Sequence, residues 1–484
     1  MPQMTWDRLL SSERSRVSAK RSGDIRSEFA KDYHRIISSA SFRRLQDKTQ
    51  VFPLDRGDFV RTRLTHSLEV SSFAGSIADT AFARLAEDHP EITPQVRADC
   101  VEILRCAGLI HDIGNPPFGH FGEYTIREWF SDNLPKLTCR GKSVYELLTP
   151  QQRADLENFE GNAQALRVLT RLHFLVDENG MNLTYALLNT IIKYPVPSTG
   201  IDKKSGDIRT KKMGYFAAEQ PLYEKITNST GAVGFDASSA YASKSCRYPL
   251  TWLLESADDI AYKTADIEDA QRKGLLTYTI LLTELTSPQL REKCRTAEEL
   301  ELLEKAAGML PHYLETAKER GMPSTEENAV QNFLVRVQSM MICAAAESFV
   351  RNYDRIMRGE LRTELLADSP ARTLSDALSD IAYRYAFNSK EILRIELSVS
   401  EMMNCLLERL SGAALRFETP QEKITDSKLI SVISENYVKI CRAGWSIEGA
   451  EAYSRLMLVT DYVCGMTDGF ARQLFRELRG EISG

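Results

Sequence analysis

Apolar residues recur along most of this chain at the spacing of α-helices, and this pattern limits the available folds more than any other feature. Between residues 66 and 85 the apolar positions are Leu68, Phe73, Ile77, Ala81 and Leu85. A second series contains Cys100, Ile103, Ala107 and Ile110. Such spacing gives a helix one apolar face. Further helical patterns cover residues 154–175, 183–192, 249–273, 275–285, 297–320, 327–358, 374–409 and 450–479. No convincing alternating strand series appears in the first half, so we expect a mostly or wholly α-helical fold.

Composition narrows the class of protein. With 484 residues, 43% hydrophobic and 26% charged, the chain is typical of a soluble globular protein with a large core. The net charge of -6 argues against a generally basic surface that coats nucleic acid, but it leaves room for a local basic patch. The nine cysteines form no Cys-x-x-Cys pair, which indicates reduced thiols and a cytoplasmic protein. The N-terminus lacks an apolar signal segment and the apolar run at 340–346 is too short for a bilayer, so we expect no membrane association.

The segment 193–216 is the least regular part of the chain and is locally basic. It holds Lys193, Lys203, Lys204, Arg209, Lys211 and Lys212 against only Asp202 and Asp207. A solvated charged loop is the common explanation of such a run. The alternative is a mobile clamp for phosphate oxygens.

Residues 109–123 concentrate groups that can bind metal or move protons. They contain His111, Asp112, His120 and Glu123 in a chain that has only seven histidines. His111 and Asp112 end one helical pattern, and imidazole and carboxylate are ligands that first-row divalent metals accept. A hydrolytic metal site needs ligands from several rigid elements. His66 opens an earlier helix, where Arg61 and Arg63 could serve an anion, and is a second candidate ligand.

A third candidate element runs from residue 255 to 262, where Asp258 and Asp259 interrupt an apolar helical stripe. Asp258 follows Leu254 by four residues and therefore shares the inward face, where a carboxylate is costly unless it is paired or bound to metal. Asp259 lies about 100° round the helix and has a surface or helix-pairing role as its plain explanation. The spacing favours Asp258 without excluding Asp259.

His120 and Glu123 are three residues apart beyond a Pro-Pro turn. If a helix begins at Gly119, both side chains lie on one face, within reach of each other. An imidazole oriented by a carboxylate is a proton-transfer pair. Glu123 could also stabilise the start of the following helix, and both roles are compatible. The remaining histidines, His34, His89, His173 and His312, are interpreted as structural hydrogen-bonding residues.

Taken together, His66, His111-Asp112 and Asp258 resemble the H…HD…D signature of the HD-domain metal-dependent phosphohydrolases. Longer strings resemble the bacterial deoxyguanosinetriphosphate triphosphohydrolase family: RRLQDKTQVFPL at 43–54, RTRLTHS at 61–67, HDIGNPPFGHFGE at 111–123, FEGNAQ at 159–164 and LTWLLESADDI at 250–260. The resemblance is strong from about residue 43 to 270. Beyond it, RIEL at 394–397 and YVCGMTD at 462–468 still fit.

The resemblance implies an all-α enzyme, one large globular unit, that cleaves a deoxynucleoside triphosphate, dGTP above all, to the deoxynucleoside and triphosphate. It implies one Mn or Mg ion per subunit and a hexamer. Residues 1–290 would form the HD-type core with N-terminal helices and the substrate loop 193–216, and residues 291–484 would complete the core and the oligomer interface. Single-stranded DNA or a nucleotide effector is a further candidate partner.

The site residues follow from the same resemblance. The metal ligands would be His66, His111, Asp112 and Asp258, and the catalytic pair His120 and Glu123. Substrate contacts would come from Gln50, Asn162, Lys193, Lys212 and Tyr262, with Arg63 as an anion-binding candidate and Arg394 and Glu396 as inter-subunit candidates. Tyr262 against C2′ would exclude a ribose hydroxyl. The alternatives are a broad-specificity dNTP triphosphohydrolase, another HD-domain nucleotide phosphohydrolase, or a regulatory oligomer that binds nucleotides or single-stranded DNA without catalysis.

Overall fold

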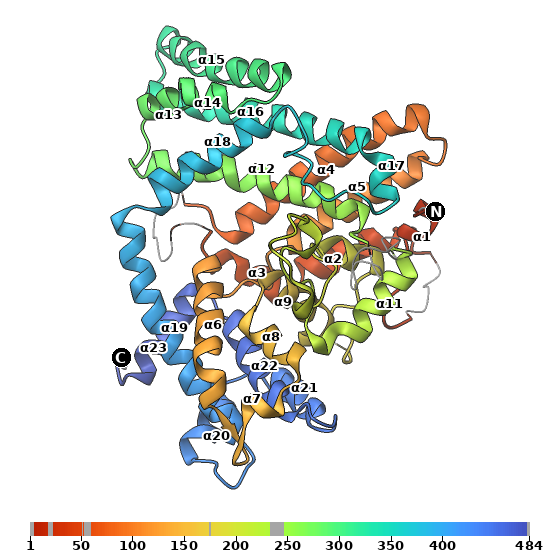
Figure 1. Ribbon diagram of the computed structural model, residues 1–484, viewed down its shortest axis with the longest axis vertical. Coiled ribbons are helices and arrows are strands. Elements are labelled where there is room, and N and C mark those ends of the chain that lie inside the picture. Colours follow the sequence, from red (N-terminus) through yellow and green to blue (C-terminus); the bar gives the residue numbers. More distant parts are fainter. Residues whose placement is uncertain are drawn as a thin grey trace.

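The computed structural model is built almost entirely from helices packed around two apolar cores, which confirms the predicted all-α globular fold (Figure 1). The structure describes residues 4–17, 23–50, 52, 60–173, 176–232 and 246–481. Its first helices are α1 (Trp6–Leu9), α2 (Glu28–Ile37), α3 (Ala40–Arg44), α4 (Arg63–Asp88), α5 (Pro94–Ile110), α6 (Gly119–Asn133), α7 (Val144–Leu147), α8 (Pro150–Glu157), α9 (Gly161–Arg167), α10 (Tyr185–Ile191) and α11 (Gln220–Thr230).

The second half of the chain continues in the same way. Its helices are α12 (Pro249–Arg272), α13 (Tyr278–Leu285), α14 (Pro288–Glu292), α15 (Ala297–Glu319), α16 (Thr325–Arg351), α17 (Tyr353–Met357), α18 (Arg372–Ala382), α19 (Lys390–Arg416), α20 (Ile424–Ser431), α21 (Glu435–Trp445), α22 (Glu451–Cys464) and α23 (Asp468–Leu478). Within the described ranges, β-structure is confined to the hairpin β1 (Thr138–Cys139) and β2 (Lys142–Ser143) and a bridge between Thr49 and Thr62.

The first core is formed by α4, α5, α12 and α16, which pack side by side. Capping residues at the N-terminal ends determine where two of these helices, α4 and α5, begin. Thr62 caps α4 because its hydroxyl accepts a hydrogen bond from the Thr65 amide, and the Thr65 hydroxyl accepts one from the Thr62 amide. Thr93 caps α5 and Pro94 follows in its first turn, where the missing N–H of proline costs no helical bond. Helices α4 and α5 pack against each other in this core.

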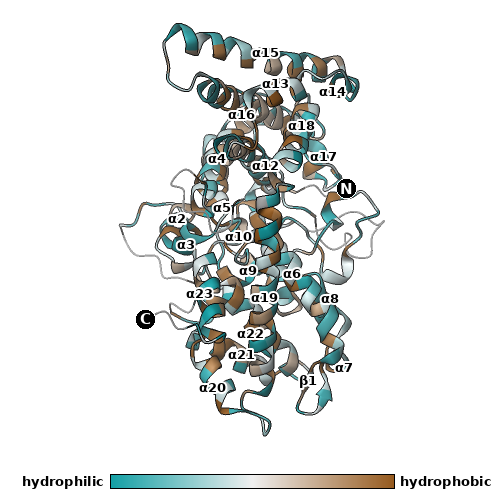
Figure 2. Ribbon diagram, turned by 90° about the vertical axis from the view of Figure 1, so that its left-hand side faces the viewer, coloured by the Kyte–Doolittle hydropathy of each residue, from teal (hydrophilic) through white to brown (hydrophobic). Residues whose placement is uncertain are grey.

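The second core is formed by α6, α19 and α22, with α20, α21 and α23 around them. Seen from the side, the molecule extends from α15 at one end to α20 at the other (Figure 2). Ile113 belongs to the first core and Phe118 to the second. The turn between α5 and α6 therefore crosses from one core to the other.

Several predicted helical stretches are divided in the structure. The stretch 450–479 is broken by residues 465–467, and 374–409 contains a π-helical turn at Tyr383–Phe387. The stretch 327–358 becomes α16 and α17, and 154–175 becomes α8, α9 and a π-helical turn at Val168–Leu172. Thr467 and Ser389 each accept a hydrogen bond from an amide three residues ahead. Such caps start a new helix while the apolar period continues, so the period alone does not reveal the break.

Helix α16 is the one described helix long and apolar enough to cross a membrane by length and composition. Half of its most apolar window is buried inside the protein. Its neighbours are α4, α12 and α15. The buried core helix of a soluble protein meets the same criteria, so this helix is weak evidence for a membrane span.

Candidate active site

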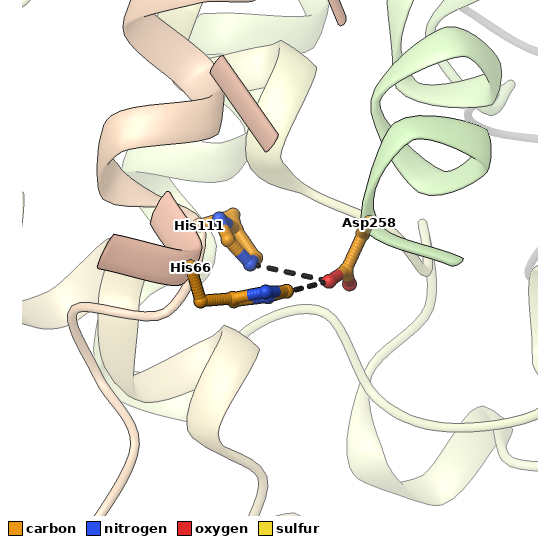
Figure 3. Close-up of side chains that lie close together, drawn as sticks. All are labelled: His66, His111 and Asp258. Carbon is orange, nitrogen blue, oxygen red and sulfur yellow. Dashed lines mark hydrogen bonds and ion pairs between the residues drawn. The ribbon is translucent and has the colours of Figure 1, made fainter. Parts of the chain in front are cut away.

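Three helices bring His66, His111 and Asp258 together beside the turn between the two cores (Figure 3). His66 lies in the first turn of α4, His111 directly after α5, and Asp258 in the middle of α12. Oδ1 of Asp258 lies 3.1 Å from Nε2 of His66 and 3.3 Å from Nε2 of His111. One ligand atom from each residue falls within 4.8 Å of the other two. The inward-face argument for Asp258 agrees with this placement.

The tautomer of His111 suits a metal ligand. Nδ1 of His111 lies 2.8 Å from the Gly108 carbonyl, which can only accept, so this nitrogen carries the proton. Nε2 of His111 is buried and has no hydrogen-bond partner in the described part of the chain. In its neutral form the ring therefore presents a lone pair at Nε2 to the same space as the Asp258 carboxylate. Two imidazole nitrogens and a carboxylate oxygen form a donor set for a first-row divalent ion with coordination positions left open.

Asp112 lies beside this group rather than within it. Its Oδ1 is 3.5 Å from Nε2 of His111 and accepts a 2.6 Å hydrogen bond from the Asn115 side chain. Its Oδ2 is paired with the buried Arg63 guanidinium. The structure thus gives Arg63 a carboxylate partner instead of an open anion site. Asp112 as a fourth metal ligand remains a prediction, as does the anion-binding role of Arg63.

Opposite charges hold the Asp258 carboxylate in its ionised form. Lys193 donates a 2.6 Å hydrogen bond to Oδ2 of Asp258, the oxygen that faces away from the histidines. Burial alone would raise the pKa of Asp258, but Lys193 and His111 lower it well below its usual range. Burial would likewise lower the pKa of His111, but Asp112 and Asp258 outweigh it and raise that pKa. The site therefore keeps its carboxylates charged.

His120 and Glu123 form the predicted pair in the first turn of α6. Nδ1 of His120 lies 3.2 Å from Oε2 of Glu123, while 86% of the His120 side chain is exposed. Glu123 is buried, and its Oε1 accepts a 2.7 Å hydrogen bond from the Gly161 amide. Burial raises the pKa of Glu123, but the contact with His120 and the charges of Lys212 and Arg127 lower it to about 2. An ionised carboxylate accepts, so Nδ1 of His120 carries the proton and Nε2 faces outward.

Glu160 is a central residue that the sequence interpretation missed. It is buried, and its carboxylate accepts hydrogen bonds from Lys212 at 3.0 Å, Arg127 at 2.9 Å and the Asn162 side chain at 2.8 Å. Burial and the nearby charge of Glu123 raise the pKa of Glu160. The available signal was its place in the string FEGNAQ, directly before a glycine. Lys212 and Asn162, two predicted substrate residues, are thus brought together by a carboxylate beside the acid/base pair.

Gly161 joins the two halves of the site. A Cβ at this position would lie 2.0 Å from Oδ1 of Asn115 and 2.6 Å from Oε1 of Glu123, so any larger residue would displace these two side chains. Asn115 in turn donates to Asp112. The start of α9 is therefore in close contact with both the metal-site turn and the acid/base pair.

The other residues predicted to contact substrate or a neighbouring subunit differ in their surroundings. Tyr262 follows Asp258 by one turn of α12, and burial together with the charges of Asp259 and Asp258 raises the pKa of its hydroxyl. Gln50 is half-buried, and its side-chain oxygen has no hydrogen-bond partner in the described part of the chain. Arg394 and Glu396 lie on α19, exposed and half-buried respectively. Val51, Pro53 and Leu54 of the motif at 43–54 fall outside the described residues.

The basic loop 193–216 does not act as one unit. Lys193 and Lys212 reach the site, whereas Lys203 and Lys204 are exposed. Arg209 is buried and pairs with Asp207. For this residue, both the solvated-loop and the phosphate-clamp interpretations are therefore wrong. The loop includes short 3-10 turns at Ser198–Gly200 and Ile208–Thr210. Three of the histidines interpreted as structural do have polar partners: His34 with Arg26, His89 with Glu91 and His173 with Ser41.

Comparison with known proteins places this geometry in a family. The model of the HD domain matches residues 63–174, which include His66, His111, His120 and Glu123. The deoxyguanosinetriphosphate triphosphohydrolase-like protein of Listeria monocytogenes is 43% identical over 99% of this chain and 100% of its own length. The like-named protein of Synechocystis is 31% identical over 99% of both chains. The deoxyguanosinetriphosphate triphosphohydrolase of Serratia proteamaculans is 31% identical over 96% of this chain and 95% of its own. The chain therefore belongs to the deoxyguanosinetriphosphate triphosphohydrolase family of HD-domain proteins.

Proposed function

We propose that the protein is a metal-dependent phosphohydrolase that cleaves deoxynucleoside triphosphates, with dGTP preferred, to the deoxynucleoside and inorganic triphosphate. The observation that carries the proposal is the meeting of His66, His111 and Asp258 beside an outward-facing His120 backed by a buried Glu123. Family membership and the names of the relatives support the same reaction. Mn or Mg is the proposed ion, one per subunit, because carboxylate and water ligands suit both ions and imidazole nitrogen is a ligand for first-row divalent metals.

The metal group and the acid/base pair have separate roles in this proposal. His66, His111 and Asp258, with Asp112 as a fourth candidate, would hold the ion. A bound divalent ion supplies Lewis acidity toward a phosphate oxygen and lowers the pKa of water. His120 exchanges a proton through its outward Nε2, with the attacking water or the 5′ oxygen of the departing deoxynucleoside. Glu123 fixes the ring and stabilises its protonated form.

Cations around the site would bind the triphosphate. Lys193 lies next to Asp258, and Lys212 next to Glu160 and the acid/base pair. Their charge offsets the negative charge that gathers on a triphosphate leaving group. In this proposal Gln50, Asn162 and Arg63 also contact substrate, and Tyr262 blocks the position of a 2′ hydroxyl. The 5′ oxygen to phosphorus bond is the one broken, because triphosphate leaves intact.

Cell location and assembly complete the proposal. The nine cysteines carry thiols rather than disulfides, as expected of a protein in the reducing cytoplasm. We place Arg394 and Glu396 at the interface of a hexamer. Single-stranded DNA or a nucleotide effector would act through that assembly.

A substrate panel tests the reaction. The four dNTPs, each with Mn or Mg, are incubated with the protein, and anions are separated by ion chromatography. We expect triphosphate and deoxynucleoside in one-to-one ratio, fastest with dGTP. Orthophosphate or pyrophosphate as the first product would contradict the reaction, and equal rates with all four dNTPs would favour the broad-specificity alternative. The double variant His111→Ala, Asp112→Ala should be inactive, whereas His312→Ala, an exposed histidine on α15, should match the wild type.

A further inference from the structure

The first residue of α23, Asp468, makes contacts far from its own helix. The residue is 3% exposed. Its Oδ1 accepts a 2.9 Å hydrogen bond from the amide of Phe118, and its Oδ2 accepts a 3.0 Å bond from the amide of Thr49 and a further bond from the Thr49 hydroxyl. Phe118 is the N-cap of α6, with a left-handed backbone of φ 64 and ψ 16. The carboxylate thus satisfies an amide at the point where the chain enters the helix of His120 and Glu123.

Lys48 makes the complementary contacts. It is buried, and its ammonium donates a 2.6 Å hydrogen bond to the carbonyl of Asn115 and another of 2.6 Å to the carbonyl of Cys464. A buried ammonium is costly unless hydrogen bonds compensate it. Asn115 lies in the turn that follows the metal-site residues, and Cys464 ends α22. Lys48 therefore ties this turn to the C-terminal helices.

The same segment also fixes the start of α4. The carbonyl of Lys48 accepts a 2.9 Å hydrogen bond from the amide of Arg63, and Thr49 pairs with Thr62 in an isolated β-bridge. Arg63 and His66 lie in the first turn of α4. One polar junction, Lys48, Thr49 and Asp468, consequently contacts the start of the helix with a metal-site histidine and the start of the helix with the acid/base pair.

We propose that Lys48 and Asp468 are positioning residues. They hold the acid/base pair, His120 and Glu123, at a fixed place relative to the candidate metal ligands His66, His111 and Asp258. The proposal rests on the proposed function. The turn at 115–118 exposes backbone groups that a fold must pair. Here the pairing comes from two charged side chains anchored to separate parts of the chain, so turn and helix starts move together. A displacement of about 1 Å at a reacting group can cost about 100-fold in rate, even when the substituted residue lies outside the chemistry.

The test compares Asp468→Asn with a matched control in the metal-loaded, full-length protein. The control is Asp426→Asn, which also alters a buried aspartate in the first turn of a C-terminal helix, but one that pairs with Arg416. For Asp468→Asn we expect kcat to fall by about 10- to 100-fold with KM changed by less than about threefold. Bound metal should equal that of the wild type. The control should lower the melting temperature while leaving kcat unchanged.

Amide hydrogen exchange supplies a readout that does not need activity. Peptides covering residues 113–121 should exchange faster in Asp468→Asn than in the wild type, and those of Asp426→Asn should not. If Asp468→Asn does not fold, Thr49→Val removes only one hydrogen bond to the same carboxylate, and we expect a smaller change in the same direction. Unchanged exchange at 113–121, or unchanged kcat with a lowered melting temperature, overturns the proposal. Faster exchange in a protein whose wild type releases no triphosphate would instead refute the proposed function.

Discussion

Replacing His120 by alanine separates proton transfer from metal binding. The ring contacts Glu123 at 3.2 Å but is 86% exposed, and it is not a member of the group formed by His66, His111 and Asp258. We therefore expect full metal content and an intact fold, with stability changed by no more than about 0.5 kcal/mol as for other exposed positions. General acid/base catalysis contributes about 100- to 10,000-fold. The expected loss in kcat corresponds to about 3 to 5 kcal/mol of activation free energy.

The assay is steady-state release of triphosphate at saturating dGTP and Mn, with metal content measured on the same samples. His34→Ala is the matched control, because His34 is also exposed and its partner is Arg26 on the N-terminal segment. The control should retain wild-type kcat. A His120→Ala variant that keeps kcat within about twofold, or that loses its metal, would refute the assignment of this residue to proton transfer.

Four further predictions follow from the same geometry. His111→Ala should lose the metal. Chelation should lower the melting temperature of the wild type, because an ion present at 100 times its dissociation constant stabilises the fold by about 2.7 kcal/mol. An unchanged melting temperature in a chelator titration would contradict a bound ion. Gly161→Ala should lose most activity and about 1 to 3 kcal/mol of stability, since its Cβ would lie 2.0 Å from Asn115; wild-type kinetics would show that the contact is not needed. Lys212→Ala should raise KM with an intact fold, and an unchanged KM would remove this lysine from substrate binding. The pKa of Glu123 is about 2 in the folded protein against 4.5 for an ordinary glutamate, so its charge stabilises the fold above pH 4.5 and this stabilisation is lost as the pH falls toward 2. In urea titrations, Glu123→Gln should therefore lose less free energy of unfolding between pH 4.5 and 2 than the wild type. An equal loss in both proteins would show that Glu123 is not the source of the pH dependence.

Local sequence was sufficient for the helices that carry the site. The inward face of Asp258 depends only on neighbours within one turn of the helix, so helical spacing predicts it. The spacing of His120 and Glu123 likewise predicts their contact, which the structure shows. Breaks such as the one before α23 were missed, because the apolar period continues across them.

Contacts between distant segments left no comparable signal. Asp468 meets Phe118 across 350 positions, and Lys48 meets Cys464 across 416. Nothing in either local sequence distinguishes these side chains from surface charges. The pairing of Asp112 with Arg63 and the gathering of cations at Glu160 have the same origin, because a charge count cannot tell which charges the fold buries together.

The most direct test of the central claim follows the oxygen atom of water through the reaction. A single turnover of dGTP in ¹⁸O-labelled water is analysed by mass spectrometry of both products. Water attack on the α-phosphorus beside His120 predicts one ¹⁸O atom in the released triphosphate and none in the deoxynucleoside. Label in the deoxynucleoside, or labelled orthophosphate or pyrophosphate in place of triphosphate, would contradict the account.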